Sequence, residues 1–329
     1  MKSLVTGASG YIGKNLVKLL VKNGIEVRAF VRKTSNIKPL LNLKNVEIFY
    51  GDVTDTSSLE NAIKGCDYVF HLAALVYDWG KYEKFYRVNY LGTENVLKAA
   101  LKANIKKFIH ISTLGVLDLR GKKIVREDCP YGHFTSAYCK TKAKAEMLVK
   151  EYNKYFPVVI LRPGAVYGPE DPMCTLRTLN YAKRNLLFLI DKGKGIFPHV
   201  YIDNLNEAIF LAFQSDKAIN ETFNILDDSL ATCHEFFNYF NKIAGKGEIK
   251  ISLPYSVAWS LALIMDTIAK ITGIPPLLSW TSLEFLTLKC KFDISKAKKL
   301  LGYNPRISLE EGMKRVESWW KRINSRFDA

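Results

Sequence analysis

The residues with the clearest chemical potential are a tyrosine and a lysine four positions apart, Tyr138 and Lys142. Residues at that spacing share one face of a helix, so the phenol and the ammonium group would lie one turn apart. A phenol has a reference pKa near about 10, and a neighbouring positive charge lowers it. The pair therefore predicts an acid–base tyrosine, although a half-exposed tyrosine beside a solvated lysine has the same spacing.

Two hydroxyl residues, Ser112 and Thr113, follow the apolar run at residues 108–111. In open parallel sheets, ligands bind outside the carboxyl ends of the strands. Hydroxyl groups at this position would therefore face the same ligand as the tyrosine.

A glycine-rich loop, residues 6–13, separates the first apolar run from the first helix-like segment. Gly7 allows a tight turn, Gly10 allows a pyrophosphate to approach the backbone, and Gly13 allows close packing of helix on strand. The helix amino terminus supplies free N–H groups and the positive end of its dipole. In this strand–turn–helix context the loop predicts dinucleotide binding rather than a purely structural turn. The predicted coenzyme contacts in the loop are Gly7, Gly10, Tyr11, Ile12 and Gly13.

The second strand-like run, residues 27–31, ends in Arg32 and Lys33 and carries no acidic residue there. An NAD-binding unit usually has a carboxylate at this point for the ribose 2′-hydroxyl. A guanidinium can instead pair with a 2′-phosphate. We therefore predict NADP(H) as the preferred coenzyme. The alternative is NAD(H), with Arg32 in solvent or stacked on the adenine.

The elements that must position these residues alternate in type through the first half of the chain. Apolar strand-like runs lie at residues 3–6, 26–31, 46–50, 68–72, 107–112 and 158–161. Between them are segments of helical periodicity at residues 12–23, 57–64, 85–103 and 137–155. This alternation predicts an α/β fold, a Rossmann-type doubly wound parallel sheet. We predict an NAD(P)-binding unit at residues 1–168, with 199–226 returning to it, and a smaller, mostly helical substrate unit at 169–329.

The composition is that of a globular protein with excess positive charge. Of 329 residues, 48% are hydrophobic and 24% are charged, which excludes a disordered or collagen-like chain. The 48 Lys and Arg residues exceed the 32 Asp and Glu residues, for a net charge of +16. This excess allows nucleic acid, an anionic membrane or a phosphate-bearing ligand as partner, or simply a basic surface. No nucleic-acid-binding module is recognisable, so we predict no such partner.

Location and membrane contact follow from the cysteines and from one apolar segment. The six cysteines have no zinc-site spacing, no metal is predicted, and reduced thiols indicate the cytoplasm. Residues 253–274 are apolar but are interrupted by Pro254, Asp266 and Lys270, so we reject a spanning helix. Residues 255–272, followed by lysine-rich sequence, could lie on an anionic membrane surface or form a lid helix over the substrate.

The whole chain resembles the extended short-chain dehydrogenase/reductase superfamily. Seven motifs in the same order support the resemblance: TGASGYIG at 6–13, GDVTD at 51–55, HLAA at 71–74, NYLGTENV at 89–96, ISTLGV at 111–116, YCKTK at 138–142 and RPGAVYGP at 162–169. The segments at 27–36, 71–96 and 292–320 resemble its dihydroflavonol-reductase-like and 3β-hydroxysteroid-dehydrogenase-like branches.

The resemblance implies a role for each matching residue. Tyr138 would be the catalytic acid–base, Lys142 the ribose-binding lysine, and Thr113 the hydroxyl that binds the reacting oxygen, with Ser112 as the alternative. The remaining predicted coenzyme contacts are Asp52 and Val53 at the adenine, Leu72, Ala73 and Ala74 along the pyrophosphate and nicotinamide, and Pro163 over the nicotinamide. Asn89 would support the site rather than react.

The site residues narrow the reaction. Related sugar dehydratases carry Asp-Glu after the site hydroxyl, where this chain has Leu114 and Gly115, so dehydration lacks its proton donor. We predict interconversion of a ketone and a secondary alcohol on an apolar, flavonoid-, sterol- or β-keto-acid-like substrate. The alternative is a nucleotide-sugar epimerase with tightly bound NAD. Tyr77 and Trp79 are the predicted substrate contacts, and the superfamily implies a homodimer.

Overall fold

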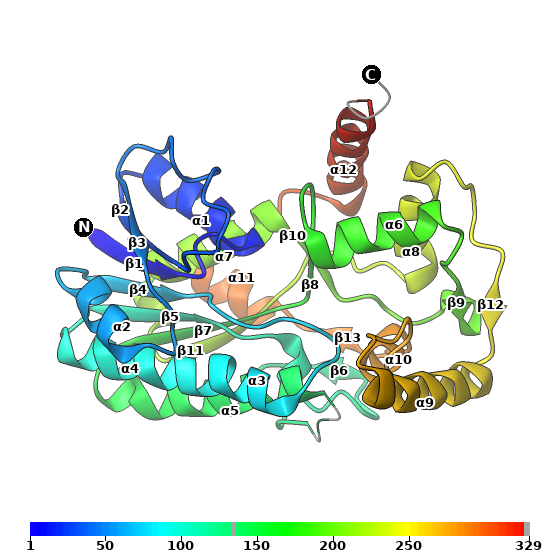
Figure 1. Cartoon of the computed structure of the whole chain (residues 1–329), viewed down its shortest axis with the longest axis horizontal. Helices are drawn as coiled ribbons and strands as arrows, with labels where there is room; N and C mark the ends of the chain where they lie inside the picture. Colours follow the sequence, from blue (N-terminus) through cyan, green and yellow to red (C-terminus); the bar gives the residue numbers. More distant parts are fainter. Residues whose placement is uncertain (133, 135, 326–329) are drawn as a thin grey trace.

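The computed structural model describes residues 1–132, 134 and 136–325. Its main element is a parallel sheet with the strand order β11-β7-β5-β4-β1-β2-β3 (Figure 1). The strands are β1 (Lys2–Thr6), β2 (Glu26–Val31), β3 (Val46–Tyr50), β4 (Tyr68–His71), β5 (Lys107–Ile111), β7 (Val158–Pro163) and β11 (Glu221–Ile225). From β1 the chain adds β2 and β3 on one side, and it then crosses back to add β4, β5, β7 and β11 on the other side. The predicted doubly wound fold is therefore confirmed.

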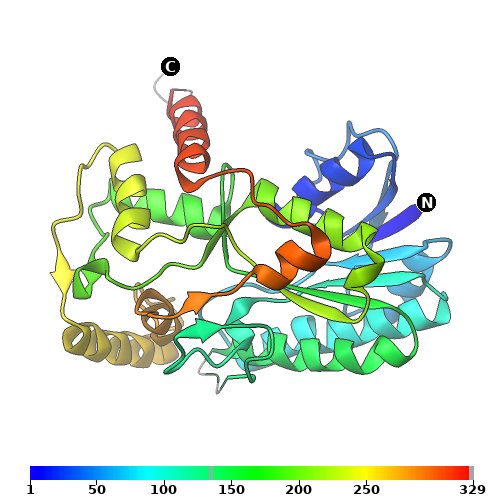
Figure 2. The same ribbon diagram turned by 180° about the vertical axis from the view of Figure 1, so that it is seen from behind.

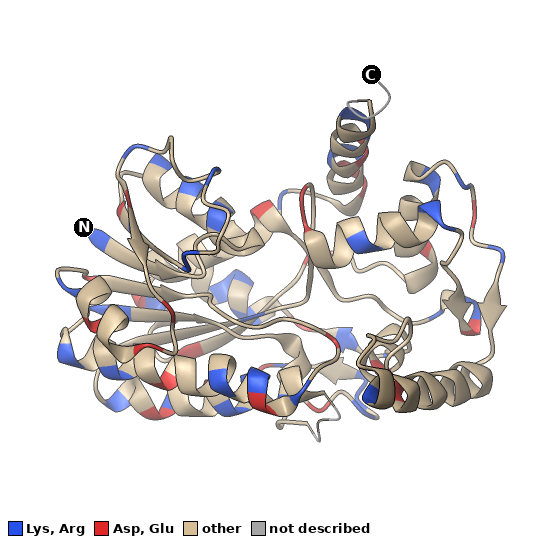
Figure 3. Ribbon diagram, in the orientation of Figure 1, with Lys and Arg blue, Asp and Glu red and all other residues tan. Residues whose placement is uncertain are grey.

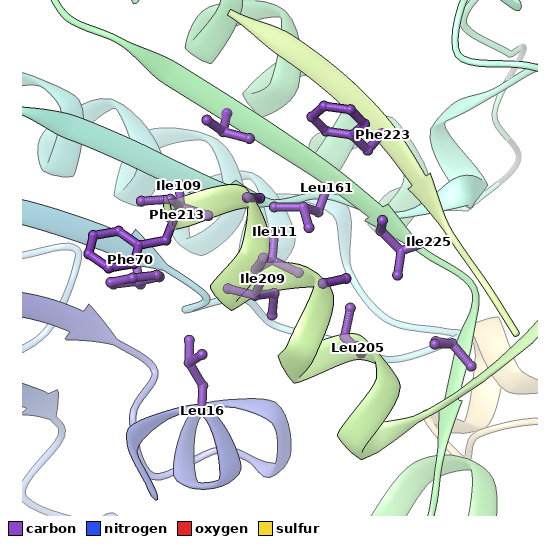
Figure 4. Packing of buried hydrophobic residues seen from close by; sticks show 14 of the residues in the cluster. Leu16, Phe70, Ile109, Ile111, Leu161, Leu205, Ile209, Phe213, Phe223 and Ile225 are labelled. Carbon is purple, nitrogen blue, oxygen red and sulfur yellow. The ribbon is translucent and has the colours of Figure 1, made fainter. Parts of the chain in front are cut away.

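Helices cover both faces of this sheet. One face carries α1 (Tyr11–Lys22) and α7 (Ile202–Gln214), and the other carries α2 (Thr56–Ile63), α4 (Gly92–Lys102) and α5 (Ala137–Glu151). Every residue of β5 and β7 is buried, including Lys107, His110 and Arg162, which explains why apolar residues predominate in these strands instead of alternating with exposed polar ones. Figure 4 shows the core on the first face, where side chains of α1 and α7 meet those of the sheet: Leu16, Leu205, Ile209, Phe70, Ile109, Ile111, Leu161 and Phe223.

Two segments that follow residue 168 in the chain pack on the main sheet of the first unit. Residues 199–226 supply α7 and the edge strand β11, which pairs with β7. Helix α11 (Ser295–Leu301), expected in the substrate unit, also packs on this face beside α7 (Figure 2). Its Ala297 and Leu301 are buried while its lysines lie outside. The apolar positions within this lysine-rich stretch therefore determine where the helix packs.

The second part of the molecule is mostly helical, with α6 (Arg177–Lys183), α8 (Cys233–Ile243), α9 (Tyr255–Thr272), α10 (Trp280–Leu286) and α12 (Leu309–Asn324). Three short parallel strand pairs complete the fold. β6 (Ile124–Val125) with β13 (Lys291–Phe292) joins this part to the first, β9 (Leu189–Ile190) with β12 (Ser252–Leu253) lies within it, and β8 (Ala165–Tyr167) with β10 (His199–Tyr201) lies between β7 and α7. Strands of two or three residues are too short to show a periodicity, so the sequence did not predict these pairs.

Candidate functional site

The predicted site residues come from one edge of the sheet, where β1, β4, β5 and β7 end. These four strands are consecutive neighbours in the sheet. The glycine loop follows β1, residues 72–74 follow β4, Ser112 and Thr113 follow β5, and Pro163 is the last residue of β7. Helix α5, which contains Tyr138 and Lys142, begins beside the loop after β5. The fold therefore brings together residues up to about 150 positions apart.

The glycine loop lies directly against the loop that follows β4. Gly7 has φ +68°, and a Cβ on it would lie 2.9 Å from both Cα and N of Ala73. A Cβ on Gly13 would lie 2.2 Å from the Gly7 carbonyl oxygen. The backbone N–H of Ala73 also donates to Thr6 Oγ1 (3.2 Å). Side chains at Gly7 and Gly13 would therefore collide with backbone atoms, which cannot move aside easily.

The amino terminus of α1 fits an anionic phosphate. Its N-cap residue, Gly10, has no side chain to cap the helix, and the first turn contains no acidic residue. The first backbone N–H groups and the positive end of the helix dipole are left available to a ligand. The Tyr11 hydroxyl, on the same turn, is buried and has no hydrogen-bond partner within the described part of the chain. Gly10, Tyr11, Ile12 and Gly13 lie on this turn, and their contact with a coenzyme stays a prediction.

The residues predicted to contact the adenosine end of the coenzyme, Arg32, Asp52 and Val53, differ in how far their side chains are exposed. Arg32 follows β2 directly, its side chain is exposed, and no ion pair is formed by it among the described residues. Asp52 Oδ1 accepts hydrogen bonds from the backbone N–H (2.9 Å) and the hydroxyl (2.8 Å) of Thr54. Val53 is buried. Arg32 therefore offers a cation at this end, while the Asp52 carboxylate is held within its own turn.

The Tyr138 and Thr113 side chains lie close enough for the Thr113 hydroxyl to lower the pKa of the Tyr138 phenol. Thr113 Oγ1 also accepts the backbone N–H of Gly115 (3.2 Å), which holds the threonine as the cap of a short helical turn. Ser112 points elsewhere, because its hydroxyl donates to Glu146 Oε2 (2.5 Å). Of the two candidate hydroxyls, the structure brings only Thr113 to the tyrosine.

Burial controls the electrostatics of the tyrosine and the lysine. It raises the pKa of Tyr138, and the Asp78 carboxylate adds to the rise, while the Thr113 hydroxyl opposes it. Burial also lowers the pKa of Lys142 to about 8. The expected lowering of the tyrosine pKa by Lys142 is therefore absent from this structure. Lys142 Nζ instead donates to the Ile111 carbonyl (2.6 Å), with His110 Nε2 at 3.4 Å.

Glu146 is an important residue that the sequence did not single out. Its buried carboxylate accepts the Ser112 hydroxyl, the Tyr131 hydroxyl (2.9 Å) and a bidentate pair of bonds from the Arg162 guanidinium, the shortest of them 2.6 Å. The Arg162 ion pair and hydrogen bonds hold the pKa of Glu146 below its usual range against the effect of burial. The signal was present, because Glu146 is one turn beyond Lys142 on α5.

Asn89 connects the loop after β4 to helix α5. It lies in a π-helical turn, Tyr86–Leu91, between α3 (Tyr82–Phe85) and α4, where the sequence predicted one continuous helix. Its side chain accepts the Leu75 N–H (2.7 Å) and donates to the Leu75 carbonyl (3.1 Å) and to Thr141 Oγ1 (3.2 Å). This geometry agrees with a supporting role, and π-helical turns are frequent at functional sites.

The loop after β4 also reaches the second part of the molecule. Tyr77 is 55% exposed and Trp79 is partly buried. Between them, Asp78 Oδ2 accepts a 2.6 Å hydrogen bond from Arg177 on α6. Each side chain of this ion pair is about 40% exposed. The pair places a guanidinium beside the loop that carries both predicted substrate contacts.

A separate cavity of about 470 Å³ lies far from these residues. Its lining includes Ile25, Tyr68 and Lys107, which stand at or beside the amino ends of strands. It contains none of the predicted site residues. In open parallel sheets the ligand site lies at the carboxyl ends, so this cavity is not assigned to the reaction.

Comparisons with known proteins agree with this geometry. The model of the 3-beta hydroxysteroid dehydrogenase/isomerase family matches residues 4–254. The chain is 29% identical to the 2-alkyl-3-oxoalkanoate reductase of Stenotrophomonas maltophilia (strain K279a), over 97% of this chain and 99% of the relative. It is 28% identical to the mouse (Mus musculus) sterol-4-alpha-carboxylate 3-dehydrogenase, decarboxylating, over 96% and 90%. UDP-glucuronic acid 4-epimerase from Bacillus cereus in complex with NAD superimposes with a TM-score of 0.79 at 28% identity, covering 98% and 99%.

Proposed function

The chain belongs to the 3-beta hydroxysteroid dehydrogenase/isomerase family, and from this membership we propose that it is an NAD(P)-dependent oxidoreductase that interconverts a ketone and a secondary alcohol. The observation that carries the proposal is that Thr113, after β5, and Tyr138, in the first turn of α5, lie close together at the sheet edge that also carries the glycine loop. Two hydroxyls that converge in this way can hold one substrate oxygen.

The roles of the residues follow from this pair. Thr113 and Tyr138 hydrogen-bond the carbonyl oxygen, and Tyr138 delivers its proton as the alcohol forms, or removes it in the reverse direction. When bound, a nicotinamide coenzyme supplies or accepts the hydride. The raised pKa of Tyr138 keeps the phenol protonated, which suits proton donation in the direction of reduction. Lys142, one turn along α5, would hold the coenzyme ribose rather than tune the phenol, because it does not lower the pKa of Tyr138 and its ammonium group donates to the Ile111 carbonyl.

NADP(H) is the coenzyme that we propose for this chain. The support is the exposed Arg32 at the end of β2, without an acidic residue beside it to repel a 2′-phosphate. The Bacillus cereus epimerase is described with NAD, so NAD(H) is the alternative that the test must separate.

For the substrate we propose an apolar 3-oxo acid or the corresponding 3-hydroxy acid. Two relatives are named for a substrate with a carboxylate near the reacting oxygen, a 2-alkyl-3-oxoalkanoate and a sterol 4-alpha-carboxylate. Arg177 offers a matching cation beside Tyr77 and Trp79, and in this structure the Asp78 carboxylate occupies it. A substrate carboxylate could take the place of Asp78, with bidentate geometry that a guanidinium favours.

The test compares initial rates on matched substrates. A long-chain 2-alkyl-3-oxo acid and its methyl ester are assayed with NADPH and with NADH, using the wild type, Arg177→Gln and Arg32→Asp. We expect Arg177→Gln to raise KM for the acid about tenfold or more and to leave the ester nearly unchanged. We expect Arg32→Asp to remove the preference for NADPH.

Three outcomes would contradict parts of the proposal separately. Equal losses on acid and ester would make the Arg177–Asp78 pair a structural contact. An unchanged NADPH to NADH ratio in Arg32→Asp would refute the coenzyme assignment. Isomerisation of a nucleotide sugar, without net consumption of added coenzyme, would replace the oxidoreductase by an epimerase.

A further inference from the structure

Helix α9 presents its large apolar side chains outward. The residues that face the protein are small, with Ala258, Ala262 and Ala269 buried against α10 and its surroundings. The exposed large apolar residues of α9 and the turn after it are Tyr255, Val257, Trp259, Leu263, Ile264, Ile268, Ile271, Ile274 and Leu277. We call this set the α9 face. Ile271 is 81% exposed and Ile274 is 68% exposed, so this pattern is the reverse of an ordinary surface helix.

Several polar side chains of α9 are satisfied within the protein. The hydroxyls of Ser260, Thr267 and Thr272 donate to the carbonyls four residues earlier, at 3.1, 2.8 and 2.9 Å. Asp266 lies on the side toward α10, where it accepts the backbone N–H of Trp280 (3.1 Å). These groups could leave water without losing a hydrogen bond, while the polar tips of Tyr255 and Trp259 suit the interface between water and lipid.

Lysines stand at both ends of the α9 face. Figure 3 shows the α9 ribbon almost free of charged residues along most of its length, with basic and a few acidic residues near its ends. Exposed lysines without an ion pair among the described residues lie before it, at its last turn, and on the neighbouring β6 and β13 segments: Lys250, Lys270, Lys122, Lys123, Lys289 and Lys291. Residues 246–291 contain five lysines and three acidic residues.

We propose that α9 is a peripheral membrane anchor, whose apolar face enters the interfacial layer of a bilayer while the flanking lysines contact anionic headgroups. The exposed area is larger than isolated surface residues account for. A helix with an apolar face and a basic border is the form that lies in a membrane interface. No helix in the described ranges has the length and apolar character needed to cross a membrane, so the contact is with one leaflet.

The charge favours a bilayer over a second copy of the chain. A symmetric contact through the α9 face would bring the lysine-rich borders of two copies together, and like charges across an interface oppose association. An anionic surface instead attracts each lysine near it by about 1 kcal/mol. The anchor does not depend on which ketone the enzyme reduces, although α9 packs on α10 at the substrate end of the molecule.

Vesicle co-sedimentation of the full chain tests the anchor. Vesicles of phosphatidylcholine alone are compared with vesicles that also contain phosphatidylglycerol, at low and high salt. We expect binding to the anionic vesicles, weakened by salt because the headgroup attraction is screened. The double variant Ile268→Asp, Ile271→Asp should reduce partitioning more than about tenfold, since it removes apolar area and adds negative charge.

The matched control is Leu41→Asp, at a 58% exposed leucine far along the chain from α9. It should bind vesicles as the wild type does. Thermal unfolding and reductase activity on a water-soluble ketone should be unchanged in both variants, because none of these side chains is buried. Absence of wild-type binding, or equal binding by the double variant, would overturn the anchor. So would self-association of the wild type that Ile268→Asp, Ile271→Asp abolishes without any vesicle binding.

Discussion

The proposed coenzyme side of the site, at the glycine loop, and the proposed substrate side, at Asp78 and Arg177, are formed by different kinds of contact. On the coenzyme side, backbone meets backbone: a Cβ on Gly7 would lie 2.9 Å from the Ala73 main chain, and α1 begins uncapped. On the substrate side, the contacts are between side chains that are partly exposed, such as Arg177 and Asp78. Backbone contacts tolerate few residue types and leave a clear sequence pattern, whereas side-chain pairs can be assembled in many ways. One side is therefore typical of a superfamily and the other of an individual enzyme.

Helix α5 forms the border between these two sides, and its successive turns have different surroundings. Tyr138, in the first turn, lies beside Thr113, where we propose that the two hydroxyls hold the reacting oxygen. Glu146, two turns later, is part of a buried network with Ser112 and Arg162. The first turn should control chemistry and the later turn should control stability, so substitutions in the two turns should have separable effects.

The largest expected effect is on turnover in Tyr138→Phe. Removal of the hydroxyl removes the proton donor but leaves the ring in its place, so kcat should fall about 10²–10⁴-fold. Coenzyme affinity, measured by fluorescence titration, should change little. Tyr131→Phe is the matched control, because that hydroxyl donates to Glu146 rather than to the substrate side. Comparable turnover in the two variants would remove Tyr138 from the reaction.

The second prediction concerns stability through Glu146→Gln. The substitution leaves the buried Arg162 guanidinium without its charge partner, and breaking such a pair costs about 3–5 kcal/mol. Urea unfolding should show this loss, while kcat per folded molecule changes far less than in Tyr138→Phe. Glu151→Gln, at the exposed end of the same helix, should lie within about 0.5 kcal/mol of the wild type.

The Glu146 carboxylate should also make the stability of the protein depend on pH in the acidic range. The folded-state pKa of Glu146 lies below its ordinary value, so its contribution is complete above the unfolded pKa, near about 4.3. That contribution is lost as the pH falls through the folded pKa. A Glu146→Gln variant should therefore lose less stability than the wild type on acidification below about pH 5. Parallel stability curves would show that the carboxylate is not the stabilising group.

The contrast between the two sides also explains what the sequence could predict. The first six strands of the main sheet and the glycine loop were predictable, because apolar runs and glycines report backbone burial and close approach directly. Glu146 was not predicted, since a charged residue on a helix is usually solvated and only the fold brings Arg162 to it. The Asp78–Arg177 pair joins residues 99 positions apart and leaves no local pattern. The position of α11 depends on two apolar residues within a lysine-rich stretch, and only packing reveals them.

Alanine substitutions at two glycines can measure how closely the glycine loop packs against Ala73. Gly7 and Gly24 both have positive φ, +68° and +75°, but a Cβ on Gly24 would have nothing within 4 Å. Gly24→Ala therefore reports the backbone cost alone, about 1 kcal/mol. Gly7→Ala should cost more in chemical unfolding, by roughly 1–2 kcal/mol, because it also displaces Ala73, and it should weaken coenzyme binding. Equal losses of unfolding free energy in the two variants would mean that the loop containing Ala73 can move away from the added methyl group at little cost.

The smallest expected effect is a pH-dependent term from Lys142, which lies between the two sides. Burial lowers its folded-state pKa to about 8, below the reference value of 10.5, so between these values the unfolded chain holds a proton that the folded chain has released. The unfolded state then binds more protons, and this group makes stability rise with pH by at most about 1.4 kcal/mol per pH unit. Lys142→Met removes the term. The difference in unfolding free energy between wild type and Lys142→Met should therefore shift in favour of the wild type from pH 8 toward pH 10, whereas other titrating groups cancel in that difference. A constant difference would show that the ammonium group is solvated in the folded protein, and would place Lys142 with the open substrate side rather than with the closed coenzyme side.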